Sequence, residues 1–236
     1  MIEKSRVPIR RAKPVTVACI DKSKIGLGVS LRRLTATLQD CYDQEFLPIW
    51  GVPLRLYNTD SPGASDWQLL YVDNASSAKK LGYHGLTRNG RPVAFVFVGD
   101  SKANNEPISV TASHELFEMA VDPIANLWAD DGNGTLHAYE IVDPVEDASF
   151  VFNGLQISSF VHPAWFEPFS HQAGTRYDHL GLIKRPFGLS GGGYAIIKDK
   201  GKVEEKFGSK AKRHAFAREA RRGHRSEYRR PNCQRI

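Results

Sequence analysis

Short apolar runs separated by turn residues dominate the first hundred residues of the chain. Four of these runs are rich in β-branched or aromatic residues and end in turn chemistry, which is typical of buried strands. After the first run, apolar residues recur at helical spacing over residues 29–46, so we expect a helix with one buried side, ended by Pro48 and Gly51. Residues 81–90 are expected to be a polar loop. The predicted strands are residues 14–21, 52–57, 67–72 and 92–98.

The sequence of the second half of the chain predicts one more helix and one hairpin. Residues 109–123 are predicted to form a helix that stops at Asp122, because the ring of Pro123 disfavours helical geometry in the residue before it. An Asn-Gly pair at residues 153 and 154 predicts a hairpin over residues 150–157. We expect the rest to be irregular: a loop at 128–134, an aromatic segment at 161–166, a glycine-rich stretch at 188–193, and a tail with one helical patch at 210–222.

These elements predict an α+β fold. Its mixed twisted sheet would carry an N-terminal helix and the helix at 109–123, followed by an irregular C-terminal part. We expect three regions along the chain: a basic N-terminal arm at residues 1–13, an α/β domain at residues 14–187, and a glycine-rich linker with a basic tail at residues 188–236.

Charge is distributed unevenly between these regions. The net charge of +6 combines an acidic body with basic ends: residues 1–13 carry 5 Lys and Arg against 1 acidic residue, and residues 198–236 carry 14 against 5. A tail of this kind can neutralise nucleic-acid phosphates without regard to sequence, or lie against an acidic protein subunit. The simpler interpretation is a solubilising end.

The cysteines and the hydropathy of the chain indicate where the protein resides. The three cysteines, Cys19, Cys41 and Cys233, are far apart in the sequence and form no CxxC pair. This pattern does not indicate a disulfide framework, so we expect a reducing compartment. No apolar run approaches the length of a membrane span, and the basic start is followed by a strand-like segment instead of a signal-peptide core. We therefore expect no contact with a membrane, no export by a simple signal peptide, and a cytoplasmic location.

The helix at 109–123 carries the strongest chemical signal, the sequence His114-Glu115-Leu116-Phe117-Glu118. At about 100° per residue, one face of this helix offers an imidazole together with the carboxylates of Glu115, Glu118 and Asp122. In an HExxH zinc site two histidines bind the metal, and the glutamate beside the first acts as general base on the bound water. Here the second histidine is replaced by Glu118, which keeps a ligand but adds negative charge.

A second acidic cluster begins 22 residues after Glu118, at Glu140. We expect Glu140 to be the third metal ligand, in competition with Asp122, and Asp143 to orient His114 through its second ring nitrogen. One histidine and two carboxylates would bind Zn2+ but neutralise it and weaken it as a Lewis acid, and an oxygen-rich site of this kind also suits Ca2+ or Mn2+. The cluster contains Glu140, Asp143, Glu146 and Asp147.

Four segments together resemble a family of uncharacterised bacterial and tailed-phage proteins with an S-H-E-x-x-E-x-x-x-D-P motif. They are residues 82–84 (Gly-Tyr-His), residues 111–123 with that motif, residues 139–143 (Tyr-Glu-Ile-Val-Asp) and residues 160–166. The resemblance implies a zincin-like fold, in which the last strand borders the cleft beside the metal-site helix, and a possible place in a phage virion. Related bacterial sequences often have a cysteine shortly after the E-x-x-D element, where this chain has Pro144-Val145-Glu146.

The remaining candidate residues have both functional and structural interpretations. His84 is a candidate catalytic residue that would act as an electrophile or fourth ligand, or it is an incidental loop histidine. His162, Tyr83 and Tyr139 are expected to pack as structural side chains, and the acidic stretch 130–134 to form a turn, since it lacks the final glutamate of a calcium loop. The motif helix itself could be an ordinary amphipathic surface helix or hold a purely structural metal.

The leading functional hypothesis is a zincin-like, zinc-dependent peptidase. His114, Glu118 and Glu140 would bind the metal, and Glu115 would act as general base. The alternative is a non-catalytic virion or assembly protein that keeps the fold and uses its basic ends to contact partner subunits or nucleic acid. In that case the tail at residues 198–236 would be its contact surface.

Overall fold

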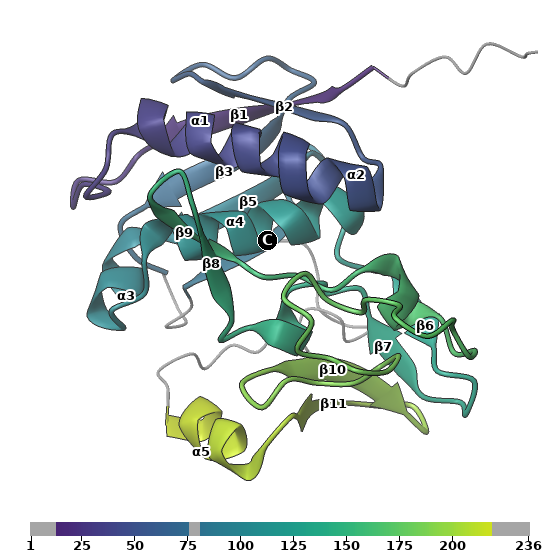
Figure 1. Ribbon diagram of the computed structural model, residues 1–236. Helices are drawn as coiled ribbons and strands as arrows, with labels where there is room; N and C mark the ends of the chain where they lie inside the picture. Colours follow the sequence, from purple (N-terminus) through teal and green to yellow (C-terminus); the bar gives the residue numbers. More distant parts are fainter. Residues whose placement is uncertain (1–12, 76–80, 219–236) are drawn as a thin grey trace, which may run out of the picture.

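The first half of the chain forms a five-stranded sheet with the order β2-β1-β3-β5-β4. The computed structural model describes residues 13–75 and 81–218 (Figure 1). Four strands are parallel, and β4, which pairs with β5, is antiparallel and lies at the edge of the sheet. The strands are β1 (Val15–Asp21), β2 (Leu54–Asn58), β3 (Trp67–Val72), β4 (Gly82–Leu86) and β5 (Pro92–Phe97).

The four strands predicted from the apolar runs are confirmed, but β4 occupies a segment expected to be a loop. Its sequence, Gly-Tyr-His-Gly-Leu, is poor in the β-branched residues that signal strands. Pairing with the apolar strand β5 therefore determines its conformation, with His84 opposite Ala94.

The first predicted helix forms and is longer than expected. It begins as α1 (Leu31–Cys41), capped by the hydroxyl of Ser30, continues through a π-helical turn (Tyr42–Phe46), and ends as α2 (Leu47–Trp50) at Gly51, whose φ is +69°. Pro48 therefore does not end the helix; it lies in the first turn of α2, where proline is tolerated because the preceding π turn already interrupts the regular hydrogen bonds.

The motif helix α4 (Ile108–Val121) is confirmed, and it is buried on all sides. It follows a short helix that the sequence did not predict, α3 (Val98–Ala103). On one side α4 contacts β4, β5 and α1, and on another it contacts β9, which lies beside it in Figure 1. The backbone N–H of Ser158 in β9 donates to the hydroxyl of Ser113 at 2.9 Å. Every residue from Ile108 to Ala120 is buried, which excludes an amphipathic surface helix.

The C-terminal half is far more regular than the sequence suggested. Residues 188–236 were expected to form a linker and tail, yet residues 194–207 supply two strands of an antiparallel sheet with the order β11-β10-β7-β6. Four of the six residues of Lys202–Phe207 are charged, which concealed this edge strand, whereas Tyr194–Asp199 is mostly buried. The strands are β6 (Trp128–Asp130), β7 (Leu136–Ala138), β10 (Tyr194–Asp199) and β11 (Lys202–Phe207).

Shorter elements complete the fold. The predicted hairpin is confirmed as β8 (Ser149–Phe152) and β9 (Leu155–Ser158), with positive φ at both turn residues, Asn153 and Gly154. Two 3-10 helices form within the acidic and aromatic segments, namely η2 (Asp143–Val145) and η3 (Pro163–Phe166). The helical patch forms as α5 (Lys210–Arg218), and the remainder of that prediction, like residues 1–12 of the basic arm, lies outside the described residues.

The segment around β10 and α5 packs on the acidic turn that follows Glu140. A Cβ atom at Gly193 would lie 1.9 Å from the carbonyl oxygen of Pro144, so only glycine fits at this contact. Lys212 of α5 is 4% exposed, and its ammonium lies 2.8 Å from Glu146 and 2.5 Å from Asp147. Lys212 therefore anchors the turn, and it is not available for the phosphate contact that we expected of residues 198–236.

The architecture is thus α+β, as predicted, with the motif helix between the main sheet and the C-terminal half. Within the described ranges, none of the helices combines the length and the apolar character needed to span a bilayer.

The contact of Lys212 predicts a measurable contribution to stability. In the Lys212→Met variant the partly buried carboxylate of Glu146, 11% exposed, loses its ammonium partner, so the free energy of unfolding should fall by about 1 to 3 kcal/mol, measured by urea denaturation. Lys210→Met is the matched control, because Lys210 is exposed on the same helix. Equal stability of the two variants would contradict the anchoring role.

Candidate metal centre

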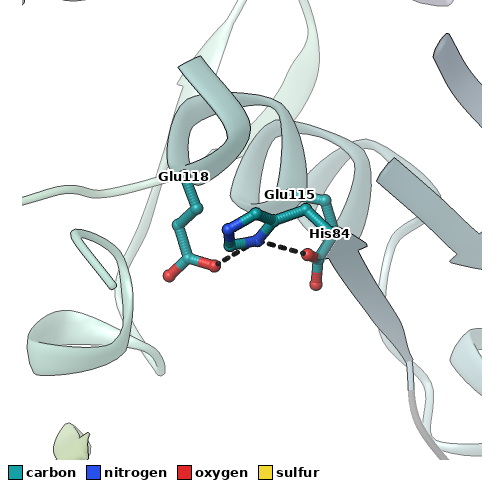
Figure 2. Close-up of side chains that lie close together, drawn as sticks. All are labelled: His84, Glu115 and Glu118. Carbon is teal, nitrogen blue, oxygen red and sulfur yellow. Dashed lines mark ion pairs between the residues drawn. The ribbon is translucent and has the colours of Figure 1, made fainter. Parts of the chain in front are cut away.

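His84 of β4 points at the acidic face of α4. Its Nδ1 lies 3.6 Å from Oε2 of Glu115 and 3.6 Å from Oε2 of Glu118, as Figure 2 shows. These distances exceed a hydrogen bond, and neither ring nitrogen of His84 makes one in the described structure. The edge strand thus adds a histidine to the one on the helix, which the sequence suggested only weakly.

His114 lies against the other oxygen of Glu118. Its Nε2 is 3.3 Å from Oε1 of Glu118 and 3.4 Å from Oδ1 of Asp143 in the acidic turn. The backbone N–H of Val142 donates to the same Oε1 at 3.3 Å, which fixes the rotamer of Glu118 and ties the turn to α4.

These contacts define two groups of possible metal ligands that share Glu118. The helix group contains His114, Glu118 and Asp143, and the strand group contains His84, Glu115 and Glu118. Within each group, the possible ligand atoms lie within 4.8 Å of one another. All five residues are buried, with exposed fractions of 9% or less. The separations of 3.3–3.6 Å match the edges of a tetrahedron around Zn2+, which for ligand distances of about 2.0–2.2 Å are about 3.3–3.6 Å.

The structure exchanges the positions expected for Glu140 and Asp143. Asp143, expected to orient His114 through its second nitrogen, faces the same Nε2 as Glu118 and so lies in a ligand position. Glu140, expected to be the third ligand beside His114, instead lies 3.9 Å from Nε2 of His84. Because the other nitrogen of that ring faces the strand group, Glu140 is placed to orient His84.

Asp122, the competing candidate for the third ligand, belongs to neither group. Its two carboxylate oxygens accept hydrogen bonds from the backbone N–H groups of Asn126 and Leu127, at 3.0 and 2.9 Å. The side chain is fully buried and caps the loop that follows α4. Asp122 shares a helical face with His114, but this does not bring its carboxylate to the ligand group, because the chain turns just after Asp122 and the carboxylate accepts backbone groups there.

The electrostatics of the cluster are most visible at His84. Burial lowers the pKa of His84, but the charges of Glu140, Glu118 and Glu115 outweigh this effect and raise the pKa above its usual value of 6.5. The carboxylates around His84 thus favour a positive charge at this position, whether a proton on the ring or a cation beside it.

Gly82 is a part of the site that sequence reasoning missed. A Cβ atom there would lie 2.7 Å from both Cγ and Oε1 of Glu115 and 2.7 Å from the carbonyl oxygen of Phe95. Glycine therefore allows β4 to lie directly on the Glu115 side chain. The motif segment Gly-Tyr-His contains this glycine, but only the packing reveals its reason.

The residues interpreted as structural are placed accordingly. Tyr139 stacks on Phe166 with ring centroids 3.9 Å apart, and Tyr83 stacks on Phe95 at 4.8 Å. Burial and neighbouring positive groups lower the pKa of His162 to about 4, as expected for a packed, neutral imidazole. In the acidic stretch 130–134 the carboxylates accept backbone N–H groups of their own turn.

Comparison with known proteins gives little beyond this geometry. No family model matches the chain, and no solved structure matches it. The photosystem II assembly lipoprotein Ycf48 of Synechococcus sp. (strain RCC307) is 30% identical over 89 residues, which is 35% of this chain and 27% of that protein. The chain thus spans about a quarter of the length of this relative, and the similarity does not establish a family.

Proposed function

We propose that the protein is a zincin-like hydrolase that uses a divalent cation to cleave peptide bonds. The observation that carries the proposal is the helix group: Nε2 of His114 lies within 3.4 Å of carboxylate oxygens of both Glu118 and Asp143, in a buried setting. Histidine nitrogen and carboxylate oxygen are common zinc ligands, and buried charges of this kind are retained where they bind metals or one another.

The arrangement of elements supports a zincin-like fold. The antiparallel edge strand β4 lies beside the helix that carries the H-E-x-x-E motif, and β4 contacts α4 directly. The family resemblance implies the same relation between the last strand and the metal-site helix. The helix ends immediately after the motif, so the chain can return with Asp143 to complete the helix group.

Zn2+ is the cation we propose for the helix group. Ca2+ prefers six to eight oxygen ligands, which a group containing a histidine nitrogen suits poorly, whereas Mn2+ accepts a mixed set of nitrogen and oxygen ligands. When bound, the cation would polarise the substrate carbonyl and lower the pKa of a water molecule.

The chain's own contribution to the reaction comes from Glu115 and His84. Glu115 follows His114 in the sequence and lies beside the helix group without belonging to it, and its carboxylate would assist deprotonation of water. His84, whose pKa is raised by the surrounding carboxylates, faces Glu115 at 3.6 Å and would stabilise negative charge that develops on the substrate oxygen.

Cation binding tests the first part of this proposal. His114→Ala should lower the affinity of the purified protein for Zn2+ by at least about 100-fold, because it removes the nitrogen ligand of the helix group; isothermal titration calorimetry measures this. Asp122→Asn is the comparison variant and should bind Zn2+ as the wild type does, since Asp122 belongs to neither ligand group and its carboxylate accepts backbone N–H groups. Equal loss in both variants would argue against the helix group.

Peptide cleavage tests the second part. Glu115→Gln should lower kcat/KM for an internally quenched peptide library by about 10²- to 10⁴-fold, while Zn2+ remains in the helix group. His162→Ala serves as a control for a histidine outside the cluster. A wild-type protein that binds Zn2+ but cleaves no peptide, with Glu115→Gln behaving identically, would favour a structural metal and the non-catalytic virion or assembly role.

A further inference from the structure

The strand group remains unexplained by one cation bound to His114. His84, Glu115 and Glu118 form a second set with ligand-like spacing, and the two groups meet at Glu118. Oε1 of Glu118 faces Nε2 of His114, whereas Oε2 faces Nδ1 of His84. The two oxygens of one carboxylate thus point to two different histidines.

We propose that the protein binds two divalent cations, bridged by the carboxylate of Glu118. The first lies in the helix group, as in the proposed function on which this inference rests. The second is held by Nδ1 of His84, Oε2 of Glu115 and Oε2 of Glu118. A bridging carboxylate of this kind is suited to cations about 3.5 to 4 Å apart, the usual separation in two-metal hydrolases.

The distances in the strand group support a cation there. Nδ1 of His84 is 3.6 Å from both carboxylate oxygens, too far for hydrogen bonds but equal to the tetrahedral edge expected for ligand distances of about 2.2 Å. The His84 side chain is only 1% exposed, so water contributes little to the solvation of this nitrogen.

The surroundings of His84 are those of a metal ligand. Glu140 lies 3.9 Å from Nε2, on the opposite side of the ring from the strand group. At this distance Glu140 acts through its charge and not through a hydrogen bond: it favours a proton on Nε2, the tautomer in which Nδ1 can bind a metal. Glu140 is therefore a positioning residue for His84.

Charge balance also favours two cations. Glu115, Glu118, Glu140 and Asp143 are each 3% exposed or less, and in the ionised form in which carboxylates bind metals they would bring four negative charges into the interior. Burying charges together is costly unless opposite charges accompany them. One divalent cation matches half of these charges, and two match them all.

A second cation changes the role of Glu115. With the second cation bound, the carboxylate of Glu115 would act as a ligand, and the pair of cations would supply the acidification of water that the proposed function assigns to one cation and Glu115. His84 then acts through the second cation and not directly on the substrate.

Counting bound cations separates this inference from the proposed function. The full-length protein, equilibrated with excess Zn2+ or Mn2+ and freed of unbound metal, should contain two ions per chain by mass spectrometry of the metal. His84→Ala and His114→Ala should each retain one, and His162→Ala should retain two. One ion in the wild type, unchanged in His84→Ala, overturns the second site but leaves the first; no ion overturns both.

A spectroscopic measurement keeps the inference testable even where a variant fails to fold. Wild-type protein loaded with Mn2+ should give an electron paramagnetic resonance spectrum of two coupled ions, as expected for a separation of about 3.5 to 4 Å. Glu118→Gln should lose this coupling because the bridge is weakened. A spectrum of isolated Mn2+ in the fully loaded wild type would overturn the bridged arrangement.

Discussion

The burial of an acidic helix is the constraint on which the rest of this structure depends. α4 carries Glu115, Glu118 and Asp122 into the interior, where each is 1% exposed or less. A carboxylate in such a position requires hydrogen bonds or positive charge. Backbone N–H groups satisfy Asp122 after the helix ends, and Val142 contributes one to Glu118. The other carboxylates of the cluster differ from Asp122 because they face histidines: His84 lies 3.6 Å from Glu115 and Glu118, and His114 lies 3.3 Å from Glu118.

Contacts from the C-terminal half hold the acidic turn against α4. Asp143 begins that turn, and the strand β10 packs on it, with Gly193 in direct contact with Pro144. Lys212 then clamps the end of the turn through Glu146. The cluster is therefore assembled from segments separated by some sixty residues, and its geometry depends on a sheet whose strands carry no ligand.

Local signals in the sequence predicted most helices and strands, but long-range packing determines which side chains meet in the candidate metal centre. The apolar runs, the Asn153-Gly154 turn and the stop at Pro123 gave the main strands, the hairpin and α4, because each depends on nearby residues. β4 was missed because two of its five residues are glycine, and the β10–β11 hairpin was missed because β11 is mostly charged. The exchange between Glu140 and Asp143 has the same origin: spacing shows that the acidic segment can return to the helix, but not which carboxylate meets which histidine.

Solvent access distinguishes the two halves of the cluster. The side chain of His114 is 11% exposed, whereas that of His84 is 1% exposed. A substrate would therefore approach from the side of His114, so the helix group is the one that can meet a carbonyl oxygen. A cation in the strand group would lie deeper, where the lower dielectric strengthens its attraction for the shared carboxylate and for the oxyanion. In the proposed two-cation site, the outer group would therefore bind the substrate, and the inner group would support it electrostatically.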